Sequence, residues 1–492
     1  KILIEEEIEK LIDMDKVILD KLKSIVGTQN FLDSKEDKLV YSYDGTPVFR
    51  HLPEAVLFPE NSDQISEILR LANQNQFNVV PRGAGTGLSG GSIPVDNSVV
   101  IVMTKWNRIL EIDSSNLTAW VEPGVVTGIF QKEVEKIGLF YPPDPGSLTV
   151  CTLGGNVATN AGGLRGLKYG VTKNYILGVE MILPNGELLK SGGKNMKDAA
   201  GYNLKDFIIG SEGTLGIITK VLVKLIPKPS NSITLLIIFN KLVDAGKTVS
   251  DIIASHIVPS MMEFLDNTTI NCVEDYAHIG LPRKSEAILL VEVDGRSSEV
   301  QEDAEIIRKI AIKNNAVALK GASDEAEANN LKTARRSAFS ALARKMPTTI
   351  LEDATVPRSE LPVMIEKVTK AAKMFDVMIG NFGHAGDGNL HPTCLTDERD
   401  SKALDKAHKA FEYIFNEAIK LGGTITGEHG TGLSKKQFLE SVAGPAGVDM
   451  MKKIKCAIDP NNILNPEKIF SISPKCEGIL PLKREQIKNF NA

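Results

Sequence analysis

Glycine is concentrated in four short segments of the first half of the chain, and these segments constrain the fold more than any other feature. Glycine has no side chain to hinder a ligand, so the backbone N–H groups of such a segment can form a concave site for an anion such as pyrophosphate. Tight turns alone would explain any one segment, but four of them favour a phosphate-binding fold. The segments are 81–91, 142–147, 153–163 and 210–216.

The first segment contains a dinucleotide-binding pattern in an unusual context. Residues 85–90 satisfy the G-x-G-x-x-G pattern, follow the strand-like 77–80, and are followed about twenty residues later by Glu111. Taken alone, this predicts a Rossmann fold, in which the pattern opens a helix. Here Pro94 lies where the first helical turns would be, and the strand-like 98–103 comes next. We therefore expect a strand–loop–strand phosphate site.

Three of the seven histidines lie among glycines in two segments of the second half. His384 and His391 are separated by the turn-forming residues 385–389, so a hairpin could bring both rings to one side. Glu428 would be a third ligand for a divalent metal, and His429 would be free to act as a base. A histidine in one glycine loop is more often an ordinary hydrogen-bonding residue, but the two segments together favour a metal site.

The composition is that of an ordinary soluble protein of 492 residues, with 42% hydrophobic and 24% charged residues. The net charge of −5 gives no electrostatic reason to expect a nucleic-acid partner. No apolar run approaches the length of a membrane span, and the charged segment 2–26 has Ile and Leu at helical spacing instead of a signal-peptide core. We therefore expect a cytoplasmic protein that does not span a membrane, with an amphipathic N-terminal helix.

The five cysteines are scattered and include no C-x-x-C pair. This pattern argues against a disulfide framework, a zinc ribbon or a cysteine-ligated iron–sulfur cluster within the chain. The cysteines are Cys151, Cys272, Cys394, Cys456 and Cys476.

Together, the glycine segments and the histidine segments resemble the FAD-binding fold of the vanillyl-alcohol oxidase superfamily, the PCMH-type FAD domain. The resemblance is closer to the branch that contains D-lactate dehydrogenases, the FAD subunit of glycolate oxidase and D-2-hydroxyglutarate dehydrogenase. It runs in motif order from about Leu39 to Phe470.

The resemblance implies FAD as the cofactor, bound non-covalently because no histidine lies in 82–91, where some superfamily members attach the flavin. It assigns 82–91 to the pyrophosphate and 210–217 to closure over the cofactor. A C-terminal segment that returns to the FAD domain would bring Asn465 near the flavin. The residues assigned to FAD are Arg82, Gly83, Ala84, Gly85, Thr86, Gly87, Leu88, Ser89, Gly90, Pro143, Asp144, Gly146, Ser147, Gly154, Gly155, Asn156, Thr159, Asn160, Gly162, Gly163, Glu212, Gly213, Ile217 and Asn465.

The same resemblance assigns the remaining chemistry to the second half of the chain. His429 would be the proton-abstracting base, and Arg335 would bind the substrate carboxylate, which a guanidinium can hold by two hydrogen bonds. Asn389 would also touch the substrate. Lys332 is a departure, because the family usually has a tryptophan there in the pocket wall. One divalent metal, iron, zinc or manganese, is assigned to His384, His391 and Glu428.

The implied activity is the oxidation of a D-2-hydroxy acid, with D-lactate to pyruvate as the best candidate, by hydride transfer to flavin N5. Electrons would pass to a separate protein such as electron-transferring flavoprotein. Glycolate and D-2-hydroxyglutarate are alternative substrates. Three other functions stay open: a metal-dependent hydrolase or lyase without flavin, a flavin-containing electron-transfer subunit without a substrate site, and a flavin-dependent oxidase of sugars or phenols.

The predicted fold class is α+β, with a two-subdomain PCMH-type FAD-binding fold and a mixed α/β cap domain that carries the metal site. Apolar and amphipathic patterns predict cap strands at 232–239, 286–294 and 373–382 and cap helices at 300–313, 324–343 and 401–421. The expected domains are an N-terminal extension (1–26), the FAD domain (27–229), the cap (230–425), a C-terminal segment returning to the FAD domain (426–470) and a tail (471–492).

Overall fold

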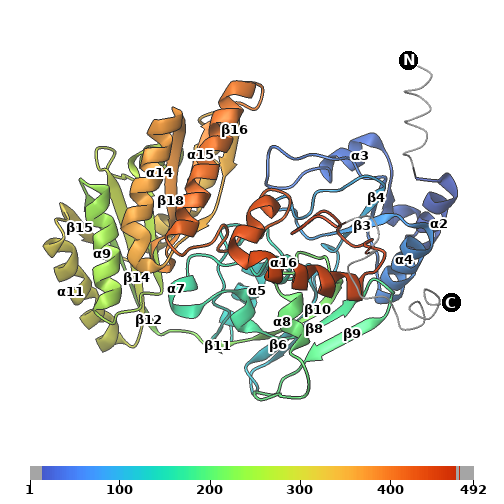
Figure 1. Cartoon of the computed structure of the whole chain (residues 1–492). Helices are drawn as coiled ribbons and strands as arrows, with labels where there is room; N and C mark the ends of the chain where they lie inside the picture. The colour runs from blue at the N-terminus through green and yellow to red at the C-terminus, as the bar shows by residue number, and fades with distance from the viewer. Residues whose placement is uncertain (1–13, 473–475, 477–492) are drawn as a thin grey trace.

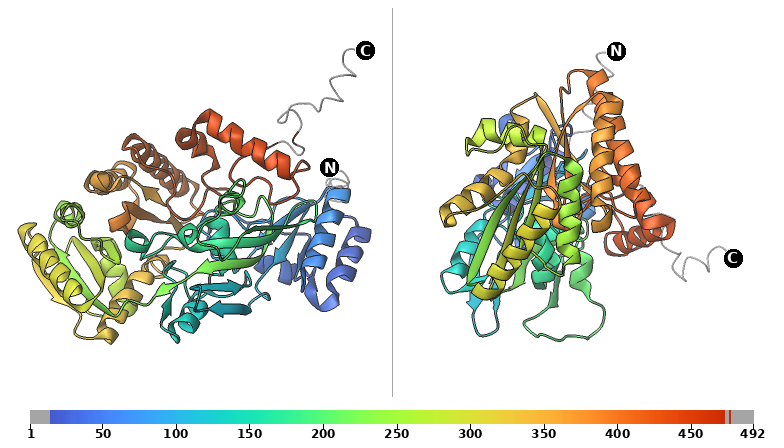
Figure 2. Two further views of the ribbon diagram at one scale, coloured as in Figure 1. Left: turned by 90° about the horizontal axis from the view of Figure 1, so that it is seen from below. Right: turned by 90° about the vertical axis from the view of Figure 1, so that its left-hand side faces the viewer.

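The computed structural model describes residues 14–472 and residue 476. Three larger β-sheets organise it: a four-stranded and a five-stranded sheet from the first half of the chain, and an eight-stranded sheet from the second half. In Figure 1 the eight-stranded sheet and its helices lie at the left, the four-stranded sheet at the right, and the five-stranded sheet below the centre. Figure 2 shows the same separation from below.

The four-stranded sheet has the order β1-β2-β4-β3, and β2, β4 and β3 run parallel. All five residues of β4 are buried, as is usual for parallel strands that are covered on their faces. Apolar side chains of α2 and α4 form the core beside these strands. The elements are α2 (Lys16–Val26), η1 (Thr28–Asn30), β1 (Phe31–Leu32), α3 (Lys35–Val40), β2 (Ala55–Leu57), α4 (Ser62–Asn75), β3 (Asn78–Arg82) and β4 (Ser98–Val102).

The first glycine segment connects β3 directly to β4, and no helix lies between the two strands. The strands are nevertheless parallel, with Asn78 opposite Ser98, so residues 83–97 cross the whole length of the strand as an irregular loop. This confirms the predicted strand–loop–strand arrangement and excludes the Rossmann context for the pattern.

The five-stranded sheet is antiparallel, with the order β5-β6-β10-β8-β9, and its core includes apolar residues of α5 and α6. Two further short strands, β7 and β11, pair beside it. The elements are β5 (Ile109–Asp113), β6 (Thr118–Val121), α5 (Thr127–Glu135), β7 (Leu139–Phe140), α6 (Leu153–Thr159), α7 (Gly166–Tyr169), η2 (Thr172–Tyr175), β8 (Ile176–Ile182), β9 (Leu188–Gly192), α8 (Leu204–Ile208), β10 (Ile217–Lys224) and β11 (Ile226–Pro227).

The eight-stranded sheet of the cap is buried on both faces. Leu235, Ile237 and Phe239 of β12 join a core with α9, α11, α14 and α15, whereas Leu236 and Ile238 join a second core with α10 and α13. The elements are β12 (Asn231–Phe239), α9 (Leu242–Ala254), β13 (Met261–Asp266), α10 (Asn267–Ala277), β14 (Ala287–Gly295), α11 (Ser297–Lys313), β15 (Ala318–Gly321), α12 (Glu325–Arg336), α13 (Ala338–Ala343), β16 (Thr348–Leu351), β17 (Ala354–Thr355), η3 (Arg358–Glu360), α14 (Leu361–Phe375), β18 (Met378–His384), η4 (Ala385–Asp387), β19 (Asn389–Thr396) and α15 (Ser401–Lys420).

Most of the predicted cap elements are present, and one was partly wrong. The strands predicted at 232–239 and 286–294 correspond to β12 and β14, and the three helices are present, with 324–343 divided into α12 and α13. The strand predicted at 373–382 begins only at Met378, because α14 continues to Phe375 and ends at Asp376 in the left-handed conformation, with φ of 53°.

After the cap, η5 (Lys436–Phe438) and α16 (Leu439–Ile458) bring the chain back to the four-stranded sheet. There the backbone N–H of Asn465 donates to the carbonyl of Val79 at 2.8 Å. The expectation against disulfides was wrong for one pair, since Cys456 and Cys476 form a disulfide. Their Cα atoms lie 5.5 Å apart because the chain turns back beside α16, which cysteine spacing alone did not reveal.

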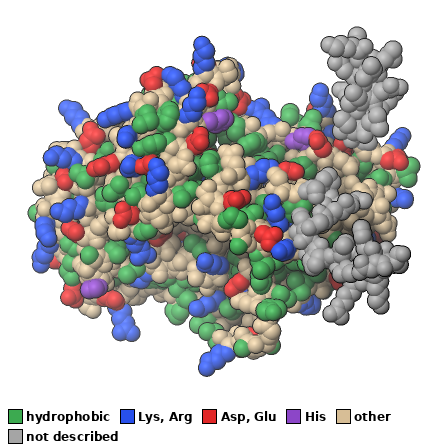
Figure 3. Space-filling view, in the orientation of Figure 1, with side chains coloured by type: hydrophobic (Ala, Val, Ile, Leu, Met, Phe, Trp, Pro, Cys, Tyr) green, Lys and Arg blue, Asp and Glu red, His purple; other side chains and the backbone are tan. Residues whose placement is uncertain are grey.

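The sequence also led to expectations about membrane spanning, surface charge and the two ends of the chain. Within residues 14–472, no helix has both the length and the hydropathy that a membrane span requires. The face seen in Figure 3 carries acidic and basic side chains interspersed, without a large area of one sign. The first part of the predicted N-terminal helix, 1–13, and most of the predicted tail lie outside the described residues.

Candidate active site

A cavity of about 580 Å³ lies where the glycine segments meet the cap and the C-terminal segment. Most of the predicted cofactor residues line it, so the fold brings together segments that are far apart in the sequence. Those that line it are Arg82, Gly83, Ala84, Gly85, Thr86, Gly87, Leu88, Ser89, Gly146, Ser147, Gly154, Gly155, Asn156, Thr159, Gly162, Glu212, Gly213 and Ile217.

Six predicted cofactor residues do not line the cavity and instead support its walls. Asn465 is an example, because its side-chain N–H groups donate to the carbonyls of Gly91 at 2.9 Å and Glu212 at 2.6 Å. Gly163 has φ of +133°, and a Cβ there would overlap the carbonyl of Asp144, so only glycine fits. The six are Gly90, Pro143, Asp144, Asn160, Gly163 and Asn465.

The β18–β19 hairpin places two histidines side by side on the cavity wall. His384 lies opposite Asn389 and Phe382 opposite His391, so both histidines project from the same face of the hairpin. Their ring centroids are 5.0 Å apart. Glu428 approaches from the C-terminal segment, with Oε1 3.2 Å from His384 Nε2 and 3.3 Å from His391 Nε2. The predicted hairpin geometry is therefore confirmed.

These three side chains fit a divalent metal. One ligand atom from each lies within 4.8 Å of the other two, and nitrogen with carboxylate oxygen is a donor set that zinc, iron and manganese accept. Among the described residues, the only basic groups within 4 Å of the Glu428 carboxylate are histidines. A mostly buried carboxylate without a lysine or arginine partner is a favourable place for a cation.

The protonation of the site follows from burial and nearby charge. Burial lowers the pKa of His384, but the carboxylates of Glu263 and Glu428 outweigh burial and raise that pKa well above its ordinary value. Burial raises the pKa of Glu428, but His384 and His391 hold it well below the usual range. Burial lowers the pKa of His429 to about 4. His429 is therefore neutral near pH 7 and can accept a proton.

Arg335 reaches the cavity from α12 and also contacts Glu263, the neighbour of His384. Its Nη2 lies 2.6 Å from Oε2 of Glu263, and its guanidinium carbon lies 4.7 Å from the ring centroid of Phe382. The next residue, Arg336, forms an ion pair of 2.7 Å with Asp144 in the second glycine segment. Two consecutive arginines of α12 therefore contact two different parts of the chain: Arg335 contacts the cap sheet, and Arg336 contacts the second glycine segment.

Asn389 and Lys332 do not line the cavity. Asn389 is buried, and its side-chain oxygen has no hydrogen-bond partner. Lys332, which stands in place of the usual tryptophan, pairs with Glu292 at 2.9 Å. The apolar part of the wall beside the site comes instead from Phe339, Leu351 and Phe382.

Sequence reasoning missed two carboxylates that hold the site in place. Glu263 lies in β13 and its Oε1 is 2.7 Å from His384 Nδ1. Asp353 follows β16 and accepts hydrogen bonds from the segment that carries Glu428 and His429. The available signal for Glu263 was a single charge within an apolar run, Met261–Leu265. The available signal for Asp353 was a pair of acidic residues, Glu352 and Asp353, directly after an apolar run.

Comparison with known proteins identifies the family of the chain. Residues 53–192 match the model of the "FAD binding domain" family, and residues 228–469 match "FAD linked oxidases, C-terminal domain". The chain is 51% identical to glycolate oxidase subunit GlcD of Bacillus subtilis, over 93% of this chain and 97% of the relative. It is 34% identical to a D-lactate dehydrogenase of Anaerostipes hadrus, over 92% of this chain and 97% of the relative.

The fold is similar to that of a solved structure of p-cresol methylhydroxylase, with a TM-score of 0.76, 18% identity, and coverage of 92% of this chain and 96% of that one. The predicted PCMH-type fold is therefore confirmed. The extent of the sequence matches places the activity class as well as the fold. The chain belongs to the FAD-linked oxidases, the oxidoreductase family that includes glycolate oxidase subunit GlcD and D-lactate dehydrogenase.

Proposed function

We propose that the protein oxidises a small 2-hydroxy acid, D-lactate or glycolate, and uses one divalent metal besides FAD. The observation that carries this proposal is the convergence on one cavity of the glycine segments, Arg335, the His384–His391–Glu428 set and His429. The 51% identity to a glycolate oxidase subunit supports glycolate, and the 34% identity to a D-lactate dehydrogenase supports the D-lactate of our sequence-based expectation.

Each residue has a distinct part in this reaction. Arg335 binds the carboxylate of the acid, and its ion pair with Glu263 fixes the direction of the guanidinium. His429, neutral at physiological pH, takes the proton of the substrate hydroxyl. Phe339, Leu351 and Phe382 give the cavity an apolar wall, against which the hydrogen or methyl group of a small hydroxy acid can pack. Bound FAD supplies the acceptor for the hydride from that carbon.

The metal would be held by His384, His391 and Glu428. Asn389 lies directly opposite His384 in the hairpin, on the same face as these histidines. Iron, zinc and manganese all accept these ligands. When bound, such an ion supplies a Lewis acid that favours loss of the hydroxyl proton.

The electron acceptor belongs to the same proposal. Electron-transferring flavoprotein remains our candidate partner, and a cytoplasmic location remains our expectation. The acceptor is tested by measuring the rate at which the purified enzyme reduces electron-transferring flavoprotein. This rate is compared with the rate of reduction of an artificial dye under the same conditions.

Substrate identity is tested by dye-linked turnover with glycolate, D-lactate, L-lactate and D-2-hydroxyglutarate. We expect kcat/KM to be highest for glycolate or D-lactate. L-lactate should react at least about tenfold more slowly, because a site that fixes carboxylate and hydroxyl leaves only one direction for the third substituent. Turnover with none of these acids, in protein that contains both FAD and metal, would overturn the proposal and favour an electron-transfer subunit without a substrate site or a sugar or phenol oxidase.

A further inference from the structure

Two sets of three side chains in the cavity wall have the spacing of metal ligands, and they share His391. One is His384, His391 and Glu428; the other is Asp353, His391 and His429. The carboxylate of Asp353 and the carboxylate of Glu428 differ in the hydrogen-bond donors that surround them. This difference separates a ligand from a residue that positions ligands.

One oxygen of Asp353 already accepts four hydrogen bonds. Its Oδ2 accepts from the hydroxyl of Thr426 at 2.8 Å and from three consecutive backbone N–H groups, those of Gly427 at 2.7 Å, Glu428 at 2.9 Å and His429 at 3.2 Å. The side chain is fully buried. A metal ion at this oxygen would compete with four donors, whereas the basic groups that approach the carboxylate of Glu428 within residues 14–472 are all histidine rings.

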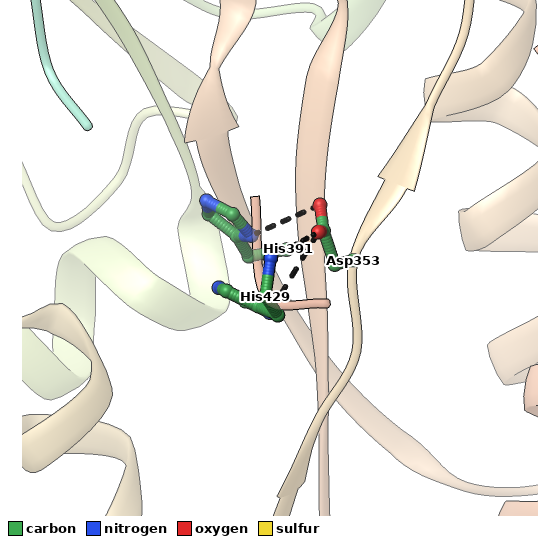
Figure 4. Close-up of side chains that lie close together, drawn as sticks. All are labelled: Asp353, His391 and His429. Carbon is green, nitrogen blue, oxygen red and sulfur yellow. Dashed lines mark hydrogen bonds and ion pairs between the residues drawn. The ribbon is translucent and has the colours of Figure 1, made fainter. Parts of the chain in front are cut away.

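The remaining oxygen of Asp353, Oδ1, lies beside His391, whereas the oxygen nearest to Nδ1 of His429 is Oδ2 (Figure 4). His391 Nδ1 lies 3.9 Å from Oδ1 of Asp353, and His429 Nδ1 lies 3.8 Å from Oδ2. Both Nδ1 atoms and Oδ1 are buried and have no hydrogen-bond partner among the described residues. The two rings are stacked, with centroids 5.0 Å apart, and their Nε2 atoms lie 3.3 and 3.6 Å from Glu428.

The two histidines therefore have the same orientation: Nδ1 towards Asp353 and Nε2 towards the centre of the site. A carboxylate beside Nδ1 favours the tautomer that carries its proton there and leaves Nε2 free as ligand or base. For His429 this preference requires that a metal ion engage Glu428, because the Glu428 carboxylate lies 3.6 Å from Nε2, as near as Asp353 lies to Nδ1. The present distances are longer than a hydrogen bond, which is common before substrate binds.

We propose that Asp353 is a positioning residue that holds the Gly427–His429 backbone and fixes the Nε2-free tautomer of His429; the inference rests on the proposed function of that histidine as the base. Asp353 itself is not a metal ligand. It acts on the reaction through the direction of Glu428 and through the nitrogen that His429 presents to the substrate.

Two measurements test the geometry without turnover. The first is ¹⁵N NMR of zinc-loaded protein labelled at histidine, with the His429 signals assigned by their loss in His429→Gln. We expect the Nδ1–H tautomer in the wild-type protein and the Nε2–H tautomer in Asp353→Asn. The second is hydrogen exchange of the peptide that covers 424–433, which should exchange about tenfold faster or more in Asp353→Asn, as loss of a buried hydrogen bond implies.

Asp266→Asn is the matched control, since Asp266 is also a buried carboxylate that accepts two backbone N–H groups, from Thr269 at 2.8 Å and Asn381 at 2.9 Å. Neither the His429 tautomer nor exchange in 424–433 should change in this variant. An Nε2–H tautomer of His429 in the wild-type protein would overturn the inference even if Asp353→Asn did not fold. Unchanged exchange and tautomer in a folded Asp353→Asn would overturn it as well.

The kinetic measurement completes the test. In Asp353→Asn we expect kcat to fall about 10²–10⁴-fold, the range seen when a carboxylate that orients a catalytic histidine is neutralised, with KM changed less than about threefold. A rise in KM without loss of kcat would contradict the positioning role. Absence of hydroxy-acid turnover in the wild-type protein would instead contradict the proposed function, and the NMR and exchange results would still decide the role of Asp353.

Discussion

Arg335 and Glu263 form an ion pair of 2.6 Å, and both side chains are almost completely shielded from solvent. The second oxygen of Glu263 lies 2.7 Å from Nδ1 of His384. One carboxylate of β13 therefore orients both the arginine proposed to bind the substrate and a histidine proposed to bind the metal. A residue of this kind couples two parts of a site that the sequence places far apart.

Glu263→Gln should weaken both functions together. We expect metal affinity to fall about 10–100-fold, as is typical when the hydrogen-bond partner of a ligand histidine is removed. KM for the hydroxy acid should rise, because Arg335 loses its charged partner. Metal content after dialysis and steady-state kinetics measure the two effects. Glu292→Gln is a matched control. Glu292 pairs with Lys332, which lies in the same helix as Arg335, but Glu292 does not line the cavity. A change in KM alone would contradict the coupling.

His384→Ala and Glu428→Ala should retain the flavin and lose metal and turnover together. The glycine segments that line the cavity are unchanged in both variants, whereas each removes one of three proposed ligands. Absorption spectra report the flavin and elemental analysis reports the metal. His408→Ala, at an exposed position of α15, serves as the control. Metal-independent turnover in both variants would refute the proposed role of the metal.

Gly163→Ala should destabilise the protein and weaken FAD binding. The substitution places a Cβ against the carbonyl of Asp144 and forces alanine into φ of +133°, which together should cost on the order of 2 kcal/mol or more. Thermal unfolding and titration with FAD measure the two effects. Gly193→Ala has open space around its Cβ and should behave like the wild-type protein. Equal melting temperatures for the two variants would contradict the steric argument.

Asp266 should make stability fall as pH rises from about 4 to about 6. Burial raises its pKa from 3.8 to about 6 in the folded protein, so between these values the folded state holds a proton that the unfolded state has lost. The stabilisation is complete below pH 4 and is lost as pH rises through 6, with a magnitude on the order of 3 kcal/mol. Thermal unfolding of the wild-type protein and Asp266→Asn across this range should show a smaller decline in the variant; parallel declines would exclude the effect.

The local geometry of the candidate site could be predicted from the sequence, whereas its supporting contacts could not. The turn between His384 and His391 is visible in the glycines of 385–389, and the proline after the first glycine segment argued correctly against a Rossmann helix. Glu263 and Asp353 were missed because their partners lie 121 and 74 residues away in the chain. The pairing of β13 with β18 brings Glu263 to His384, and the return of the C-terminal segment to the cap brings residues 426–429 to Asp353.

Two other differences between the sequence-based predictions and the structure also arise from contacts between residues far apart in the chain. Cys456 and Cys476 meet because the chain turns back beside α16, a tertiary event with no local motif. Residues 373–375 belong to α14 because their neighbours pack on the sheet as a helix, although the residues also suit a strand. Long-range packing, which overrides local preference, decided both.

The central claim is that one cavity combines FAD with a site that binds and deprotonates a 2-hydroxy acid. The most direct test is an anaerobic absorption spectrum of the purified protein before and after addition of glycolate or D-lactate, with L-lactate and D-2-hydroxyglutarate for comparison. We predict that the oxidised-flavin band is bleached by glycolate or D-lactate within the time of one turnover. A flavin band that none of these acids bleaches, in protein with its metal bound, would contradict the claim.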